Sequence, residues 1–191
     1  MNRRKFISLS MILGGSAITA YYGNKYFQVS GAPNLDYLNN HKTIISELAE
    51  LIIPKTDTPG AKDCMAEEYI LHHLTYNTNE KDVNKFIYGL QDVQSESMTQ
   101  FKKNFLQLNL QEKNTLLKYF EKETLNLNGK LAKIRNKLFG KPFFTTLKEL
   151  TTIAYCTSLK GSTIGLKYEA IPGKYLAVTS YHQGQKSWAT K

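Results

Sequence analysis

Residues 48–61 read LAELIIPKTDTPGA, which predicts the end of an amphipathic helix, a proline stop and a rigid turn. Apolar residues before the proline recur at helical spacing: Ile44, Ile45, Leu48, Leu51 and Ile52. Pro54 has no backbone N–H and disfavours a helical conformation at Ile53, so we expect the helix to end there. In the turn that follows, Pro59 fixes one φ angle and Gly60 can adopt a positive φ angle. The residues alone predict a helix end and a stiff loop that leads into a second helix.

Helical spacing continues on both sides of this turn. Asp63 is a plausible N-cap for the second helix, and Asn109 and Glu112 have the spacing of a capping box. Pro142 suits the first turn of a later helix, because the missing N–H is not needed there. The expected helices span residues 40–53, 63–74, 80–93, 109–124 and 142–157.

The remaining stretches show no clear pattern. Residues 95–104 are polar, and residues 125–140 are lysine-rich with room for a short helix. Gly161 and Gly165 are expected to end regular structure. No alternating run is long enough to indicate a sheet. The predicted fold is mostly α: a compact single-domain helical bundle of about five helices with an irregular C-terminal segment.

The chain begins with a short basic leader. Arg3 and Arg4, with Phe6 two places on, resemble the twin-arginine (Tat) export signal, and the uncharged run that follows is weakly hydrophobic. An ordinary Sec-type leader or a short membrane anchor is the alternative, since residues 6–22 approach the length of a membrane span. The predicted organisation is a signal peptide or anchor over 1–20, a linker over 21–40, a helical domain over 41–180 and a basic tail over 181–191.

Composition and motifs narrow the function classes. The chain has 25 basic and 16 acidic residues, a formal net charge of +9, and its lysines are scattered without a nucleic-acid motif. We therefore expect no nucleic-acid partner, and a basic surface suited to an acidic partner. No dinucleotide-binding glycine pattern and no haem-attachment motif occurs. Cys64 and Cys156 are too few for an iron–sulfur cluster, and their spacing leaves open whether they pair or remain buried thiols.

Residue types that could carry chemistry do not form a known pattern. His72 and His73 are neighbours, and adjacent residues diverge by about 100° on a helix, so they do not easily share a metal. Glu67 and Glu68 fall in a first helical turn, where carboxylates complement the helix dipole. We predict no catalytic, cofactor-binding or metal-binding residue in this chain.

Three blocks of sequence are similar to one known family. The first is ELAELIIP with TDTPGA, residues 47–54 and 56–61; the second is FFTTLKEL with YCTS, residues 143–150 and 155–158; the third is YEAIPGKY, residues 168–175. In this order they resemble the gluconate 2-dehydrogenase subunit 3 family and extend over about residues 44–176.

The resemblance implies a non-catalytic small subunit of a flavin-dependent sugar or sugar-acid dehydrogenase. In such a complex a large flavoprotein subunit holds FAD, and a cytochrome c subunit with haem passes electrons onward. The small subunit would assist folding, export and assembly of the flavoprotein and engage the Tat translocon. The expected location is periplasmic or exported, at the outer face of the cytoplasmic membrane, attached through the partner or an uncleaved leader.

A partner-binding face is expected around the turn and near the C-terminus. Tyrosines give a large contact area at low entropic cost, and with Pro54-Lys55 and Pro172-Gly173 they are candidates for one docking face. The alternative is that these rings pack the C-terminal loop onto the helices. The candidate interface residues are Pro54, Asp57, Pro59, Gly60, Tyr155, Tyr168, Pro172, Gly173 and Tyr175. Two other functions stay open: a stand-alone exported helical binding module, and a metal-dependent enzyme.

Overall fold

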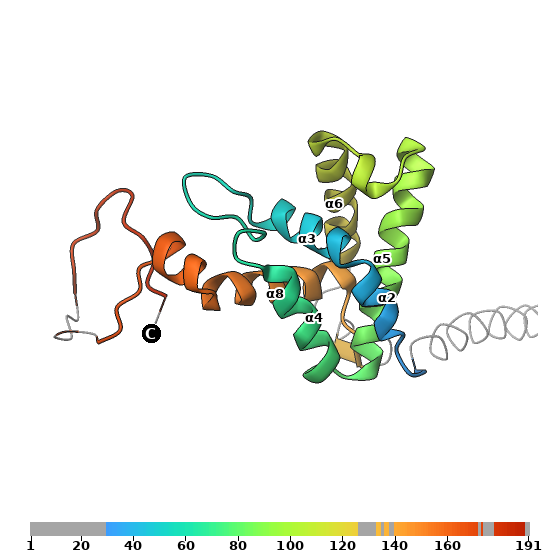
Figure 1. Cartoon of the computed structure of the whole chain (residues 1–191), viewed down its shortest axis with the longest axis horizontal. Coiled ribbons are helices and arrows are strands. Elements are labelled where there is room, and N and C mark those ends of the chain that lie inside the picture. Colours follow the sequence, from blue (N-terminus) through green and yellow to red (C-terminus); the bar gives the residue numbers. More distant parts are fainter. Residues whose placement is uncertain are drawn as a thin grey trace, which may run out of the picture.

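The computed structural model describes residues 30–125, 133–134, 136–137, 140–171, 173 and 178–189. These residues are mostly helical, which confirms the predicted fold class (Figure 1). The longer helices are α3 (Lys42–Ile52), α4 (Ala66–Tyr76), α5 (Glu80–Phe101), α6 (Leu110–Leu125) and α8 (Phe143–Thr157). The short elements are α2 (Leu35–Asn40), the 3₁₀ turn η1 (Phe105–Gln107) and the π-helical turn η2 (Gly161–Gly165).

Five of the residues singled out from the sequence lie outside the described part of the chain: Arg3, Arg4, Phe6, Pro172 and Tyr175. Most of the lysine-rich stretch 125–140 also lies outside it. The described residues contain no strand, only an isolated parallel bridge between Lys167 and Trp188. No helix in the described ranges is both long and apolar enough to span a bilayer.

The first expected helix, over residues 40–53, corresponds to α3, and an additional short helix, α2, precedes it. α2 occupies the end of the predicted linker, and its N-terminus is capped by Asn34, whose side chain accepts a 3.0 Å hydrogen bond from the Tyr37 N–H. His41 then interrupts the helix, and α3 begins at Lys42. The His41 ring stacks on Tyr37 at 3.9 Å between centroids, and its Nδ1 lies 2.7 Å from the Tyr37 carbonyl oxygen. These local contacts turn the chain between the two helices.

α4 begins three residues later than the sequence indicated. Asp63 does not cap the helix; the residue before α4 is Met65, which adopts a left-handed conformation with φ 52°. The chain reaches α4 through a tight turn in which the Ala66 N–H donates to the Ala61 carbonyl at 3.0 Å. Met65 is therefore turned outward and is 65% exposed.

α5 extends eight residues beyond its predicted end, through a stretch that showed no pattern. The stretch has an inward face after all, because Val93 and Ser97 lie four residues apart and both are buried. Ser97 is accommodated because its hydroxyl donates to the Lys103 carbonyl at 2.6 Å. The helix ends at Lys102, which is left-handed with φ 56°. The pattern of apolar residues did not predict this part of the helix, because one of its buried positions is a serine.

The two last predicted helices are confirmed within a residue at each end. α6 is preceded by the expected capping box: the Glu112 N–H donates to Asn109 Oδ1 and the Asn109 N–H to Glu112 Oε2, both at 2.9 Å. α8 follows Pro142 directly. Its buried apolar residues recur at helical spacing: Phe143, Phe144, Leu147, Leu150 and Ala154.

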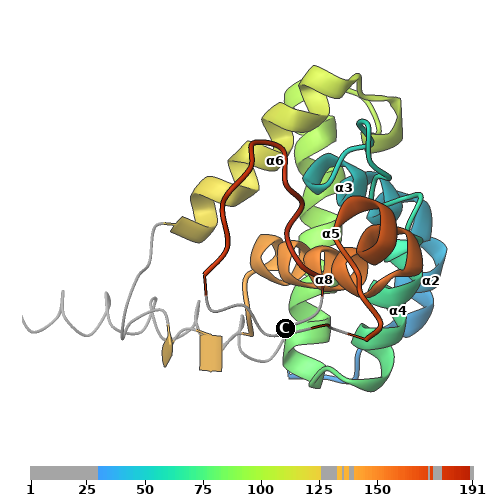
Figure 2. The same cartoon turned by 90° about the vertical axis from the view of Figure 1, so that its left-hand side faces the viewer.

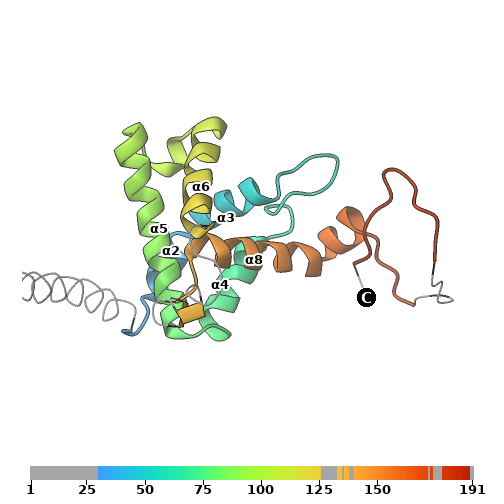
Figure 3. The ribbon, with the colours of Figure 1, turned by 180° about the vertical axis from the view of Figure 1, so that it is seen from behind.

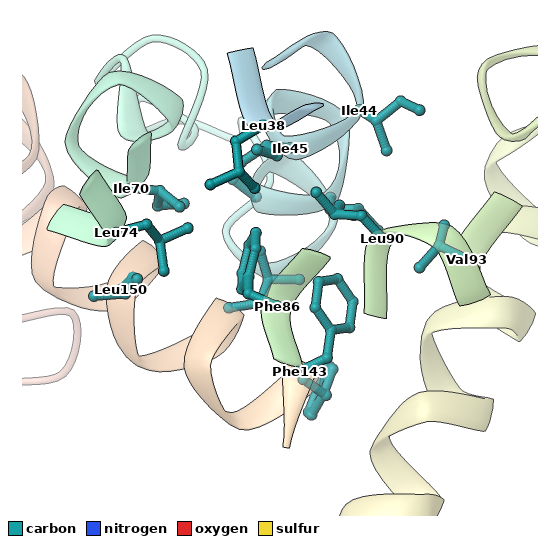
Figure 4. Packing of buried hydrophobic residues seen from close by; sticks show 14 of the residues in the cluster. Leu38, Ile44, Ile45, Ile70, Leu74, Phe86, Leu90, Val93, Phe143 and Leu150 are labelled. Atoms are coloured by element: carbon teal, nitrogen blue, oxygen red, sulfur yellow. The ribbon is translucent and has the colours of Figure 1, made fainter. Parts of the chain in front are cut away.

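α8 lies in the middle of the bundle, and α3, α4, α5 and α6 all pack against it (Figure 2). Its first residue, Phe143, stacks at an angle on Phe86 of α5 with ring centroids 5.0 Å apart, and edge-to-face on Phe120 of α6 at 6.0 Å. Further core residues close around this centre (Figure 4), including Leu38, Ile45, Ile70, Leu74, Leu90 and Leu150.

Gly89 of α5 faces the same point. A Cβ added to Gly89 would overlap both the Cβ and the ring of Phe143. Because the Phe143 Cβ is fixed by its backbone, no change of rotamer relieves the overlap. The crossing of α5 and α8 therefore depends on the missing side chain at Gly89.

We expect Gly89→Ala to destabilise the fold by about 2 kcal/mol. Overpacking costs up to about 3 kcal/mol, and the higher helix propensity of alanine returns about 1 kcal/mol. The measurement is the free energy of unfolding in urea, with Ser95→Ala on the exposed side of α5 as the control, expected to change stability by less than about 0.5 kcal/mol. A Gly89→Ala protein as stable as the parent would contradict the close packing.

Candidate functional site

The loop between α3 and α4, residues 53–65, is hydrogen-bonded across its base. The Ala61 N–H donates to the Ile53 carbonyl at 2.9 Å and so joins the two ends of the loop. Nearer the tip, the Thr56 N–H donates to the Thr58 carbonyl at 3.1 Å. Pro54 ends α3 in the way the sequence predicted. The result is a projecting loop with a fixed backbone (Figure 1).

Glu50, in the last turn of α3, accepts hydrogen bonds from two backbone N–H groups of the loop. Its Oε1 accepts a hydrogen bond from the Lys55 N–H and its Oε2 one from the Lys62 N–H, both at 2.9 Å. Gly60 is packed so closely against this carboxylate that an added Cβ would overlap it. Gly60 does not adopt the positive φ angle that glycine permits. Among the described glycines, only Gly140 and Gly184 have a positive φ angle. Glycine is needed here for close approach to Glu50 rather than for an unusual backbone angle.

Asp63 closes the other side of the loop. Its carboxylate accepts from the Gly60 N–H at 3.3 Å and pairs with the Lys55 ammonium at 3.1 Å. The hydrogen bond from Lys55, then the Gly60 N–H, and the positive charge of Lys160 lower the pKa of Asp63 below its ordinary value. Lys160 lies just beyond the end of α8, so this interaction relates the loop to the C-terminal side of the bundle.

Glu47 connects the loop to two helices. From α3 its carboxylate contacts Lys62 in the loop and Lys113 in α6, the second at 3.0 Å. Burial alone would raise the pKa of Glu47, but the hydrogen bonds from Lys62 and Lys113 outweigh burial and lower it. Lys113 is itself largely buried, with 12% of its side chain exposed, so the pair is better shielded from water than a surface ion pair.

A groove of about 400 Å³ separates this loop from the start of α6. Its apolar surface includes Leu110, which is 66% exposed. Its charged groups are already bonded within the chain, so the groove combines an exposed apolar side chain with polar groups that have partners. Such a surface suits the side chain of another protein better than it suits acid–base chemistry. The groove is lined by Glu47, Glu50, Leu51, Pro54, Lys55, Leu110, Lys113 and Asn114.

The structure brings together the candidate residues of the turn. Pro54 and Asp57 are exposed, Pro59 is half-buried, and Gly60 is buried against Glu50. These four residues lie in one loop, as expected, although Gly60 itself offers no surface.

Among the candidate interface residues towards the C-terminus that the structure describes, one is buried and two are exposed. Tyr155 is buried, because Gly161 packs on its carbonyl and Gly165 on its hydroxyl. The Tyr155 ring therefore packs between the C-terminal segment and the helices, and it does not belong to an exposed interface. Gly161 and Gly165 also do not end regular structure; they form η2, which covers Tyr155. Tyr168 and Gly173 are exposed in the segment after η2.

Other groups with possible chemistry are dispersed. Within the described residues no group of three or more His, Cys, Asp or Glu side chains could hold a metal ion. His73 stacks on Tyr69 and is half-buried, while His72 is exposed and contacts Tyr76. Cys64 is buried and Cys156 half-buried, and both are free thiols.

Glu47 and Glu50, which organise the loop, were not among the residues predicted from the sequence. Glu47 and Glu50 lie on one face of a helix just before a proline stop, and that spacing could have marked them. Their partners could not be found in this way, since Lys113 is 66 residues from Glu47 and meets it only in the folded protein.

The comparisons with known proteins give one result. Residues 39–173 match the profile of a protein family described as gluconate 2-dehydrogenase subunit 3. The matched range contains the loop, the groove and all of α3 to α8. No curated protein and no solved structure matches the chain significantly.

The lowered pKa of Glu47 makes a pH-dependent contribution to stability. A carboxyl whose pKa is lower in the folded state stabilises the fold above its unfolded pKa, near 4.5, and loses this contribution as the pH falls through the folded value. We expect Glu47→Gln to be less stable than the parent at pH 7 by about 1 kcal/mol or less, because the group is partly exposed. The difference should narrow towards pH 3, as measured by urea unfolding at several pH values. A difference that is constant with pH would contradict the role of the charge.

Proposed function

The chain belongs to the gluconate 2-dehydrogenase subunit 3 family, and from this premise we propose that it is the non-catalytic small subunit of an exported, membrane-associated gluconate 2-dehydrogenase-like oxidoreductase complex. Its task in this proposal is to bind the flavoprotein subunit, assist its folding, and take it through export and assembly. The flavoprotein holds FAD and oxidises the sugar or sugar acid. A cytochrome c subunit with haem receives the electrons.

The observation that supports this most is the preformed loop over residues 53–65 within the matched range. Its backbone N–H groups are bonded to Glu50 and Asp63, and its exposed residues are held in place before any partner arrives. A surface ordered in advance loses less conformational entropy on binding. The neighbouring groove has charged groups with partners and an exposed apolar side chain, which favours a protein contact.

The leader supports the second part of the proposal. Arg3, Arg4 and Phe6 resemble a twin-arginine signal, and this route transports proteins that are already folded. A flavoprotein bound to this subunit before export would share its signal and reach the periplasm in the same step. The complex would then reside at the outer face of the cytoplasmic membrane.

The role of the loop is tested with Gly60→Ala. The added Cβ would overlap the Glu50 carboxylate and lie 2.7 Å from the Lys55 backbone nitrogen, so the carboxylate must swing away or the loop backbone must shift, and either change breaks the hydrogen bonds between Glu50 and the loop. We expect the affinity for the flavoprotein subunit to fall at least tenfold, measured on the co-expressed and purified subunits, and the flavin absorbance that accompanies the chain to fall with it.

Gly31→Ala is the matched control, since nothing lies within 4 Å of a Cβ there. Undiminished binding by Gly60→Ala would show that the loop is structural only. If the parent chain purifies without any flavoprotein, a stand-alone binding module becomes the better interpretation.

The export step is tested with Arg3→Lys and Arg4→Lys together. Lysine preserves the positive charge but not the arginine pair, so simple attraction to an anionic membrane is unchanged. We expect both this chain and the flavoprotein to accumulate in the cytoplasm, measured by cell fractionation and immunoblotting. Ser10→Ala in the same leader serves as the control. Normal periplasmic flavoprotein in the double variant would contradict shared export.

A further inference from the structure

The segment after η2 carries large apolar side chains that the protein does not bury. We call its described residues, 166–171, 173 and 178–189, the C-terminal arm. It lies beyond the end of α8, away from the helical bundle (Figure 1 and Figure 3). Ile171 is 86% exposed, Val178 89% and Tyr181 76%. Single exposed apolar residues are ordinary, but several along one projecting segment mark an interaction surface.

The arm is fastened at its base. The Lys167 N–H donates to the Ser187 carbonyl and the Ala189 N–H to the Lys167 carbonyl, both at 2.8 Å. The Lys167 ammonium lies 4.1 Å from the centre of the Trp188 ring, a cation–π contact. The two ends of the arm are thus joined next to η2, and the described residues between them project away from the bundle (Figure 1).

Few backbone groups in the projecting stretch of the arm pair with another described residue. Among the described residues of the arm, the hydrogen bonds to other described residues lie at the base and in the turn from His182 to Gln185. The backbone groups of residues 168–171 and 178–181 make none to another described residue. The backbone groups of an extended segment can pair with the edge of another protein.

The C-terminal part of the chain is also basic. Residues 159–191 contain five lysines and one acid, Glu169, which gives 5 − 1 = +4 of the chain's formal charge of +9. The described lysines, Lys160, Lys167 and Lys186, flank the base of the arm, whereas Ile171, Val178 and Tyr181 belong to the projecting stretch. A matching surface would have an apolar groove with carboxylates at its rim.

We propose that the C-terminal arm is a second docking element, which lies in an acid-rimmed apolar groove of the flavoprotein subunit and pairs its backbone there. This inference rests on the proposed function for the identity of the partner. A lipid surface would satisfy the lysines and the apolar side chains. It would not satisfy the backbone groups, because hydrocarbon offers no hydrogen-bond partners. A protein groove satisfies all three.

The test uses the full chain co-expressed with the flavoprotein subunit. Hydrogen exchange is compared between the free chain and the complex, and we expect the amides of residues 178–181 to exchange at least tenfold more slowly in the complex. Ile171→Asp with Val178→Asp should raise the dissociation constant at least tenfold and leave the melting temperature of the free chain unchanged, since both residues are exposed. Gln183→Asp, in the exposed turn, is a control that adds one negative charge to the arm without removing an apolar side chain, and it should bind like the parent.

The outcomes separate this inference from the proposed function. A complex that forms with parental affinity in the double variant, and without protection of residues 178–181, overturns the docking role of the arm and leaves the subunit role intact. Absence of any complex with the parent chain overturns both. Binding of the full chain to phosphatidylglycerol vesicles that is lost in the double variant, with the complex unaffected, assigns the arm to a membrane and overturns the inference.

Discussion

The close contact between Gly89 of α5 and Phe143 of α8 sets the arrangement of the bundle. With no side chain at Gly89, the start of α8 can approach α5 until the Phe143 ring fills the space beside Phe86 and Phe120. α8 then lies in the middle, and α3, α4 and α6 bury their apolar faces against it. Because dense cores respond to a change of a single methyl group, one position fixes how the helices meet.

The polar contacts that hold the loop over residues 53–65 form because the helices are arranged in this way. They fix the conformation of the loop more than they add to its stability. Hydrogen bonds and ion pairs between partly exposed groups contribute little net free energy, since water competes for each of them. Their effect is to restrict the backbone: Glu50 and Asp63 bond the loop from two sides, and Glu47 joins it to α6. A loop held in this way presents the same surface to every partner that approaches.

The loop and the C-terminal arm are energetically different surfaces. The loop has its polar groups bonded within the protein, so little ordering remains to be done on binding. The arm has apolar side chains that are exposed, so a partner that bound it would bury them. A helical fold by itself is compatible with many functions, so the subunit role rests on family membership and these two surfaces, not on the bundle.

The sequence by itself determined the helical class, the proline stop at Pro54, the capping box of Asn109 and Glu112, and the inward face of α8. Each of these depends on neighbours within a few residues, which the chain displays directly. Three blocks of residues also indicated the family.

Only the tertiary structure decided the rest. Ser97 is buried because Lys103 accepts its hydroxyl, Tyr155 because η2 folds over it, and Lys113 pairs with Glu47 because α6 packs beside α3. The Glu47–Lys113 pair depends on which distant segments become neighbours, and the burial of Ser97 and Tyr155 depends on how the chain folds back after each helix. Local spacing cannot determine that, because the free energy that brings the segments together comes from burial of the whole core.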